Sequence, residues 1–157
     1  MQTFNMVKEN MRNQSLINYL NTEGYAVGLK FIVDEKQIEK HKLNVGTHPD
    51  VIEMLWGDHT KEIPIRCQAI LLGRPVLVNP NTGIVFGLAE GTNPPLLRLP
   101  ETDRVNLLEK GGGILLSDLD GVYANARDIG NDWIYCFSFI DNLEKYFLSA
   151  YKYSNNN

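Results

Sequence analysis

The stretch LGRPVLVNPNTGIVFGLAEGTNPPLLRLP, residues 72–100, decides the fold, because short apolar runs alternate in it with turn-forming residues. The apolar run at 76–78 is followed by Asn-Pro-Asn-Thr-Gly at 79–83, where proline fixes φ and glycine tolerates a positive φ. A second run lies at 84–89, and a third at 96–99 follows a loop with two prolines. Short strands joined by such turns predict an antiparallel meander.

The residues before this stretch extend the pattern. Apolar and polar residues alternate at the start of 63–72, which predicts an earlier strand that ends at Gly-Arg-Pro, residues 73–75. Within the second run, Ile84, Phe86 and Leu88 are spaced two apart, so we expect them on one face of the sheet.

One helix is predicted before the meander in sequence and another after it. Residues 47–57 (THPDVIEMLWG) begin with Thr47 as a candidate N-cap and end with Gly57, which can adopt the left-handed conformation that ends a helix. Residues 101–110 follow a proline, begin with acidic side chains and stop before the triple glycine at 111–113. After that glycine run we expect strand, turn and strand near an exposed edge.

Both ends of the chain contain amphipathic patterns. The segment up to Gly24 predicts one helix or two short ones, 25–33 predicts a strand, and the charged segment 34–42 predicts a short exposed helix. Near the C-terminus, Asp141 is a good N-cap for a helix with an apolar stripe. The stripe consists of Leu143, Tyr146, Phe147, Ala150 and Tyr151.

These elements predict an α+β fold: a single domain with a mainly antiparallel sheet, helices packed on one face and a C-terminal amphipathic helix. A chain of 157 residues is long enough for one core, so we expect the domain to span residues 1–153. Residues 154–157 are small and polar and predict a disordered tail. Cys67 and Cys136 lie in apolar surroundings, which favours two buried, reduced thiols.

The composition restricts the classes of partner. The formal net charge is −4 and no Lys/Arg cluster is visible, which argues against nucleic acid. No apolar run approaches the roughly 20 residues of a membrane helix, and the N-terminus lacks the apolar segment of a secretory signal. We therefore expect a cytoplasmic protein that does not associate with membranes.

No complete catalytic or metal motif is present in the sequence. His41, His48 and His59 lack carboxylate or cysteine neighbours at metal-ligand spacing, which favours solvated or capping roles. The segment Ser-Asp-Leu-Asp-Gly at 117–121 begins like a calcium loop but lacks the glutamate expected at position twelve. The triple glycine follows a helix and lacks the Lys-Ser/Thr pair of a phosphate loop. We expect no metal, no cofactor and no enzymatic activity.

One electrostatic feature remains, an excess of acidic residues after the triple glycine. Between residues 111 and 144, six acids face only Arg127 as a base. A local negative surface can steer and orient a basic protein partner, although it can also serve only solubility. We select four of these acids as the candidate partner-binding site: Asp118, Asp120, Asp128 and Asp132.

The strand and turn residues resemble those of a known group of proteins. The segments PIRCQAILLGRPVLVNPNTGIVFGLAEGT and LLRLP, with GNDWIYCFSF and EKYFLSAYKY further on, resemble a loosely defined group of small bacterial cytosolic proteins. In size, acidity and lack of catalytic motifs the chain is also similar to immunity proteins, which neutralise toxins delivered between competing bacteria. This resemblance implies a protein partner and assigns no role to any residue.

The leading hypothesis is a small acidic immunity-type protein that occludes the active surface of a basic toxin domain. The alternative is a small hydrolase or ligand-binding enzyme with a pocket near Arg74, Arg98 and the acids after the triple glycine. A further alternative is a homodimer that uses some of the aromatic residues of the C-terminal third, most of which we expect in the core.

Overall fold

The computed structural model describes residues 10–21, 47–58, 60–119 and 126–156. The strand predicted at 25–33 and the charged segment at 34–42 lie outside these ranges. Four α-helices are described: α2 (Gln14–Asn21), α4 (Pro49–Glu53), α5 (Glu101–Glu109) and α6 (Glu144–Tyr153). Five short 3₁₀ or π turns accompany them: η1 (Met11–Asn13), η2 (Met54–Asp58), η3 (Ile65–Cys67), η4 (Leu116–Leu119) and η5 (Ala126–Ile129).

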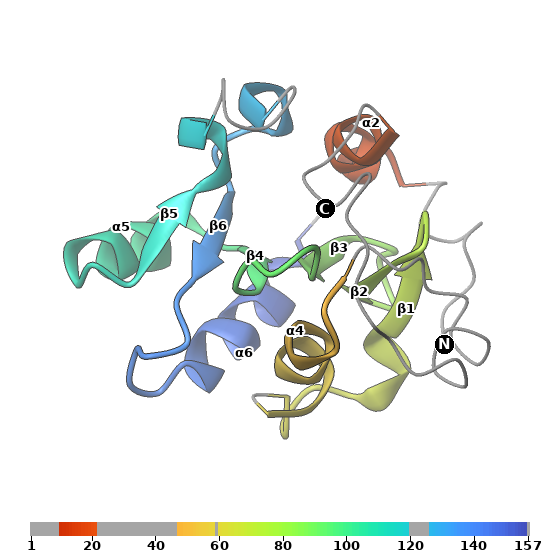
Figure 1. Cartoon of the computed structure of the whole chain (residues 1–157). Coiled ribbons are helices and arrows are strands. Elements are labelled where there is room, and N and C mark those ends of the chain that lie inside the picture. Colours follow the sequence, from red (N-terminus) through yellow and green to blue (C-terminus); the bar gives the residue numbers. More distant parts are fainter. Residues whose placement is uncertain (1–9, 22–46, 59, 120–125, 157) are drawn as a thin grey trace.

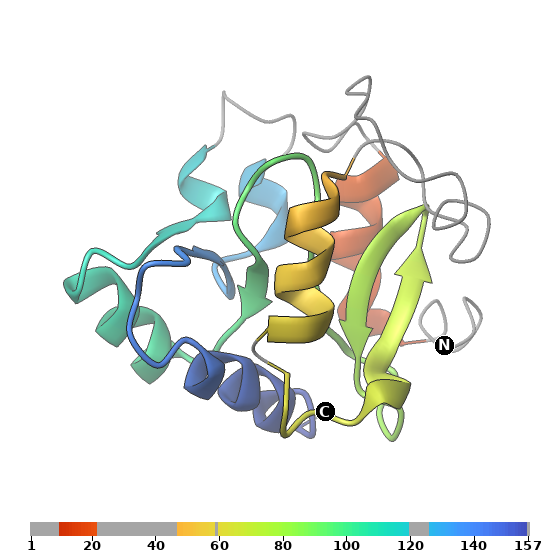
Figure 2. The same cartoon turned by 60° about the horizontal axis from the view of Figure 1, so that its bottom comes forward.

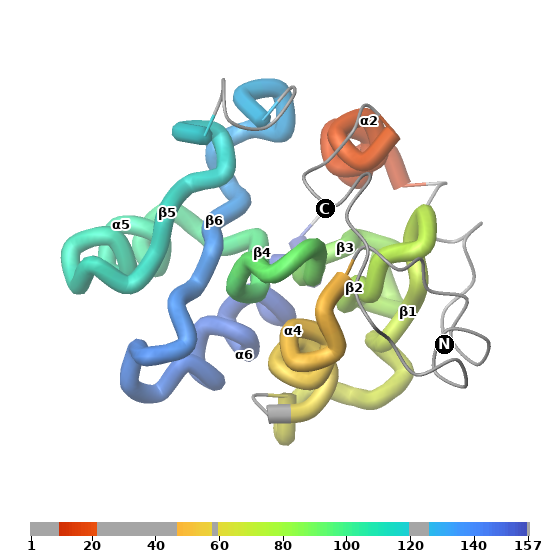
Figure 3. The backbone as a smooth tube through the Cα atoms, viewed as in Figure 1, coloured from red at the N-terminus to blue at the C-terminus, as the bar shows by residue number. Residues whose placement is uncertain are grey.

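The centre of the fold is an open, antiparallel, six-stranded sheet with the order β1-β2-β3-β4-β6-β5. Its strands are β1 (Gln68–Leu71), β2 (Arg74–Val78), β3 (Val85–Leu88), β4 (Leu96–Arg98), β5 (Gly113–Leu115) and β6 (Trp133–Cys136). The first four form the predicted meander. Figure 3 traces how the chain then leaves the sheet and returns to place β6 between β4 and β5.

The turn residues account for the meander. Leu72 and Gly73 both have positive φ, 50° and 78°, at the tight turn between β1 and β2. Gly83 has φ 75° at the end of the 79–83 turn, which the sequence predicted. Asn13 fixes this turn to the N-terminal helices, because its side chain donates to the carbonyl of Gly83 and accepts from the amide of Val85.

The pairing of β2 with β3 contains a β-bulge. Leu77 pairs with Gly87 and Val78 pairs with Val85, so Phe86 has no direct partner. An extra residue in one strand reverses the faces of the side chains beyond it. As a result Phe86 packs on one side of the sheet and Leu88 on the other, and the expectation that they share a face is wrong.

Helices cover both faces of the sheet. On one face the core combines α2 with η4 and η5, through residues that include Leu16, Leu20, Leu116 and Ile129. On the other it combines α4, α5 and α6, through residues that include Val51, Leu107, Tyr146 and Phe147. Figure 1 shows α2 and α4 on opposite sides of the sheet, and Figure 2 brings α4 and α6 to the front. The α+β class, the antiparallel sheet and the C-terminal helix are confirmed. Helix α2 also covers the second face of the sheet, so the helices are not confined to one face.

Three helix ends differ from the predictions. His48 caps α4 in place of Thr47, because its Nδ1 accepts from the amide of Asp50, while Thr47 is buried and bridges to Gly91. Gly57 lies within the π turn η2 and does not have a positive φ. Helix α6 begins at Glu144 without a side-chain cap, so Asp141 is not its N-cap.

The first strand and the C-terminal residues also differ from expectation. Strand β1 begins at Gln68, after the 3₁₀ turn η3, and Ile65 is exposed. Ser154, expected in a disordered tail, is buried; its hydroxyl accepts from the side chain of Asn79, 3.0 Å away, and its carbonyl accepts from Thr82. The end of the described chain is therefore fixed to the turn between β2 and β3. Of the helices in the described ranges, none combines the length and apolar character that crossing a membrane requires.

Candidate functional site

The four predicted acids do not form one cluster. Asp118 on η4 and Asp128 on η5 are both exposed, and these two short helices pack against each other. Asp120 lies outside the described residues. Asp132 lies just before β6 and faces inward, towards basic side chains. Of the three described carboxylates, folding thus leaves Asp118 and Asp128 on a shared surface, which we call the η4–η5 surface.

Asp132 is the centre of a hydrogen-bonded ion-pair cluster. Its Oδ2 lies 3.0 Å from Nη2 of Arg98 and accepts from the hydroxyl of Tyr153 at 3.2 Å. Its Oδ1 lies 3.9 Å from Nη1 of Arg104. The carboxylate therefore balances part of the charge of two arginines, Arg98 on β4 and Arg104 on α5. Its role in partner binding stays a prediction.

Arg98 is a charged residue at the end of a buried strand. It pairs across the sheet with Trp133, and the amide of Leu99 donates to the carbonyl of Asp132 at 2.9 Å, so the register brings Arg98 and Asp132 together. The guanidinium carbon lies 4.7 Å from the ring centroid of Tyr153, a cation–π distance. The residue is only 9% exposed, and its Nη1 has no hydrogen-bond partner in the described structure.

A pocket of about 210 Å³ lies beside this cluster. Its wall combines elements that are distant in sequence: Arg12, Ser15, Arg98, Ile129, Asp132 and Trp133. The Ser15 hydroxyl donates to the carbonyl of Ile129 at 3.2 Å and so ties α2 to η5. This pocket lies near Arg98 and an acid that follows the triple glycine, as the alternative hypothesis expected.

Arg74, the other arginine of that hypothesis, lies elsewhere. Its Nε is 3.5 Å from Oε2 of Glu90, with both side chains almost fully buried, and its Nη1 donates to the carbonyl of Leu72. The hydroxyl of Tyr19 donates to Oε1 of Glu90 at 2.9 Å. A buried charge needs such partners to persist in a core, and the bond from Tyr19 to Glu90 ties α2 to this buried pair.

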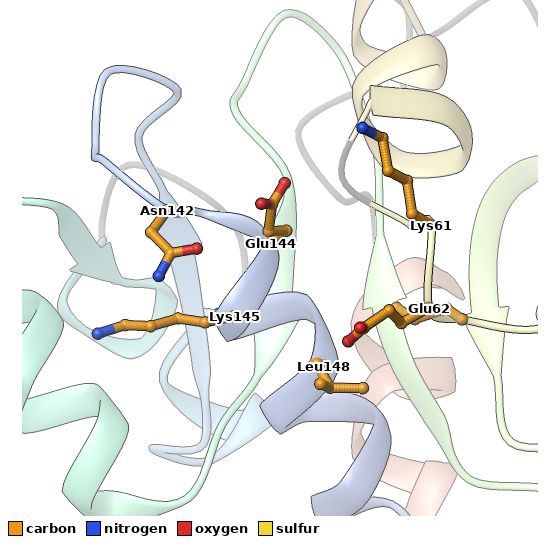
Figure 4. Close-up of a pocket in the computed structure, with 7 residues that line it drawn as sticks. Lys61, Glu62, Asn142, Glu144, Lys145 and Leu148 are labelled. Atoms are coloured by element: carbon orange, nitrogen blue, oxygen red, sulfur yellow. The ribbon is translucent and has the colours of Figure 1, made fainter.

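A larger pocket, of about 330 Å³, lies between the segment after η2 and the start of α6. Figure 4 shows Lys61 and Glu62 on one side, and Asn142, Glu144 and Lys145 on the other. Two lysines and two glutamates line it, so the opposite charges balance. Because Glu144 is here and Asp118 is on η4, the acidic residues of 111–144 are spread over separate parts of the surface.

The remaining candidate reactive groups are inert or dispersed. Both cysteines are buried and free: burial raises the pKa of Cys67 to about 11, against a smaller lowering by Arg66, and burial also raises the pKa of Cys136. Both are therefore protonated thiols at neutral pH, which are poor nucleophiles. Within the described ranges, no three His, Cys, Asp or Glu side chains are grouped so as to hold a metal ion. His41 and His59 lie outside those ranges.

The described aromatic side chains of the C-terminal third divide between core and surface. Four are buried: Trp133, Tyr135, Tyr146 and Phe147. Three are partly buried: Phe137, Tyr151 and Tyr153. Phe139 is 71% exposed and stacks on Phe137 with ring centroids 5.5 Å apart. Homodimerisation through such an aromatic stays a prediction.

No protein-family model matches the chain, and no curated protein or solved structure shows significant similarity to it. The similarity to small bacterial proteins of the immunity type therefore stays a prediction, and the site is interpreted from its own residues.

Four contributors to the arginine cluster and its pocket were missed in the sequence: Arg12, Ser15, Arg104 and Tyr153. They come from four helical elements, η1, α2, α5 and α6, and of these only η1 and α2 are adjacent in sequence. One signal was available. Arg98 interrupts the apolar run Leu-Leu-Arg-Leu, and a charge within a buried strand requires a partner of opposite charge.

Proposed function

We propose that this protein is a binding protein whose η4–η5 surface contacts a basic surface of a protein partner, in the manner of an immunity protein that covers a toxin. The observation that carries the proposal is the exposure of Asp118 and Asp128 on two short helices that pack together. Exposed charges of one sign accelerate association with an oppositely charged surface and orient the partner.

The charge balance on this surface supports the proposal. The adjacent basic residue, Arg127, has its Nε 3.8 Å from Oδ1 of Asp128. Both side chains of this pair are mostly exposed, at 74% and 67%, so water and salt weaken their attraction. A partner that offers two or more cations can compete for Asp128 at low cost.

The inert chemistry of the described residues agrees with a role in binding. The two thiols are buried and protonated, and the buried Arg74–Glu90 pair links elements of the core. These groups stabilise or fill the fold, which leaves the surface as the place where specificity resides.

The test is affinity capture with matched charge-reversal variants. The wild-type protein, Asp118→Lys/Asp128→Lys and a control with the same change in charge, Asp141→Lys/Glu109→Lys, are immobilised and exposed to lysate of the native host and to the product of the adjacent gene. Both control residues are exposed and lie on other segments.

We expect one basic protein to be retained by the wild type and the control, and to bind the η4–η5 variant about tenfold more weakly or worse. Retention should also fall as salt rises. Equal retention by all three proteins, or turnover of a small molecule with no protein partner, would contradict the proposal.

A further inference from the structure

The pocket beside Arg98 differs in charge from the protein as a whole. The chain carries a net charge of −4, yet the pocket is lined by two arginines, Arg12 and Arg98, with a single acidic residue, Asp132. That carboxylate is also 3.9 Å from Arg104 and accepts a hydrogen bond from Tyr153. Arg98 and Arg104 therefore approach Asp132, and Arg12 adds a further arginine to the pocket wall, so the described charged residues at the pocket carry a net positive charge.

The two arginines of the wall retain unused hydrogen-bonding capacity. Nη2 of Arg98 lies at Asp132, but Nη1 is buried and lacks an acceptor within the described ranges. A buried donor left without an acceptor costs about 1–3 kcal/mol. The guanidinium of Arg12 is exposed and forms no ion pair with a described residue.

We propose that this pocket binds a small oxyanion, a phosphate or carboxylate group, between the guanidinium groups of Arg12 and Arg98. Guanidinium presents a planar fork of donors that fits both kinds of group. Ser15 also lines the pocket, and its hydroxyl can turn from the Ile129 carbonyl to donate to the anion. The site is distinct from the η4–η5 surface, because neither Asp118 nor Asp128 lines it.

Binding requires a small movement of Arg98. Because Nη1 is covered, the guanidinium fork must tilt towards the pocket while Nη2 keeps its contact with Asp132. We therefore expect modest affinity, with a Kd of about 1 mM for the isolated anion. Trp133 forms part of the wall, so its indole signal reports directly on the site.

The test is an NMR titration of the ¹⁵N-labelled full chain with sodium phosphate and, separately, with sodium acetate, each at constant ionic strength set by sodium chloride. We expect saturable shifts of the Trp133 indole and the Ser15 amide. Saturation by either probe supports the site, and the stronger probe identifies the preferred anion. The absence of saturable shifts with both probes up to about 50 mM would overturn the proposal.

Two arginine variants test whether the anion binds in the pocket or only responds to the overall charge of the protein. Arg12→Gln removes an exposed pocket arginine, and Arg66→Gln removes an exposed arginine that is not part of the pocket wall. We expect Arg12→Gln to weaken binding about fivefold or more and Arg66→Gln to change it less than about twofold. Equal affinities of the two variants would also overturn the proposal.

Discussion

Two arginine–aspartate pairs use aspartates from the same short stretch of sequence, Asp128 and Asp132, but differ in distance and in exposure to solvent. Arg98 and Asp132 approach to 3.0 Å, with side chains only 11% and 27% exposed. Arg127 and Asp128 approach to 3.8 Å, with most of each side chain in solvent. The first pair is shielded and joined by further donors, whereas the second is hydrated and exposed to salt. The comparison teaches that an aspartate's sequence neighbourhood does not determine its role; its depth in the fold does.

The largest expected effect comes from removing the shielded aspartate. Asp132→Ala leaves Arg98, Arg104 and the Tyr153 hydroxyl without their shared acceptor. We expect the free energy of unfolding in urea to fall by about 3 kcal/mol, the lower end for a broken buried pair because Asp132 is partly exposed. Asp128→Ala is the control, with an expected change below about 0.5 kcal/mol. Equal losses in both variants would erase the distinction between the two pairs.

Replacing the arginine of each pair should give a smaller difference in unfolding free energy, again with the larger loss in the shielded pair. Arg98→Met keeps an aliphatic side chain of similar length but removes the charge from Asp132 and from the Tyr153 ring. We expect a loss of about 2 kcal/mol, because Arg104 and Tyr153 still contact the carboxylate. Arg127→Met should be neutral within about 0.5 kcal/mol. A neutral Arg98→Met would show that the shielded pair adds nothing to stability.

Removing only the hydroxyl of Tyr153 separates the stability contributed by its hydrogen bond from that contributed by the packing of its ring. Tyr153→Phe removes one donor to Asp132 and keeps the ring beneath Arg98. We expect thermal unfolding to report a loss of about 1 kcal/mol. Tyr151→Phe is the matched control, since no described residue bonds to the Tyr151 hydroxyl. An equal loss of stability in Tyr151→Phe would mean that the effect comes from α6 in general and not from the hydrogen bond to Asp132.

Salt should give the smallest effect. Raising sodium chloride from about 0.05 M to about 0.5 M screens exposed charges far more than shielded ones. We expect the stability penalty of Asp132→Ala to change by less than about 0.5 kcal/mol over this range. A penalty that disappears in high salt would place Asp132 in effective contact with solvent and remove its difference from Asp128.

The sequence predicted most of the fold because local chemistry determines it. The Asn-Pro-Asn-Thr-Gly turn, the glycine at 73 and the apolar runs between them are short-range signals, and all appear in the meander. The errors occur where tertiary contacts override local preference. Thr47 is drawn into a bridge with Gly91 and yields its capping role to His48, and the bulge at Phe86 is not visible in a regular two-residue pattern.

The candidate site was less predictable. Its acids are predicted from a local excess of acidic residues in the sequence, which carries no information on depth, so exposed Asp128 and shielded Asp132 look alike. The pocket joins Arg12, Arg98 and Asp132, and only the sheet order β4-β6 with α2 above it brings them together. Spacing along a sequence does not reveal such long-range neighbours.

A pair of double-mutant cycles tests the distinction between the two pairs most directly, because each cycle isolates one pairwise energy. Unfolding free energies of Arg98→Met, Asp132→Ala and their combination give the first coupling, and Arg127→Met, Asp128→Ala and their combination give the second. We predict a coupling of about 1–2 kcal/mol for Arg98 with Asp132 and below about 0.5 kcal/mol for Arg127 with Asp128. Equal couplings, or a larger one for the exposed pair, would contradict the assignment of Asp132 to the fold and of Asp128 to the binding surface.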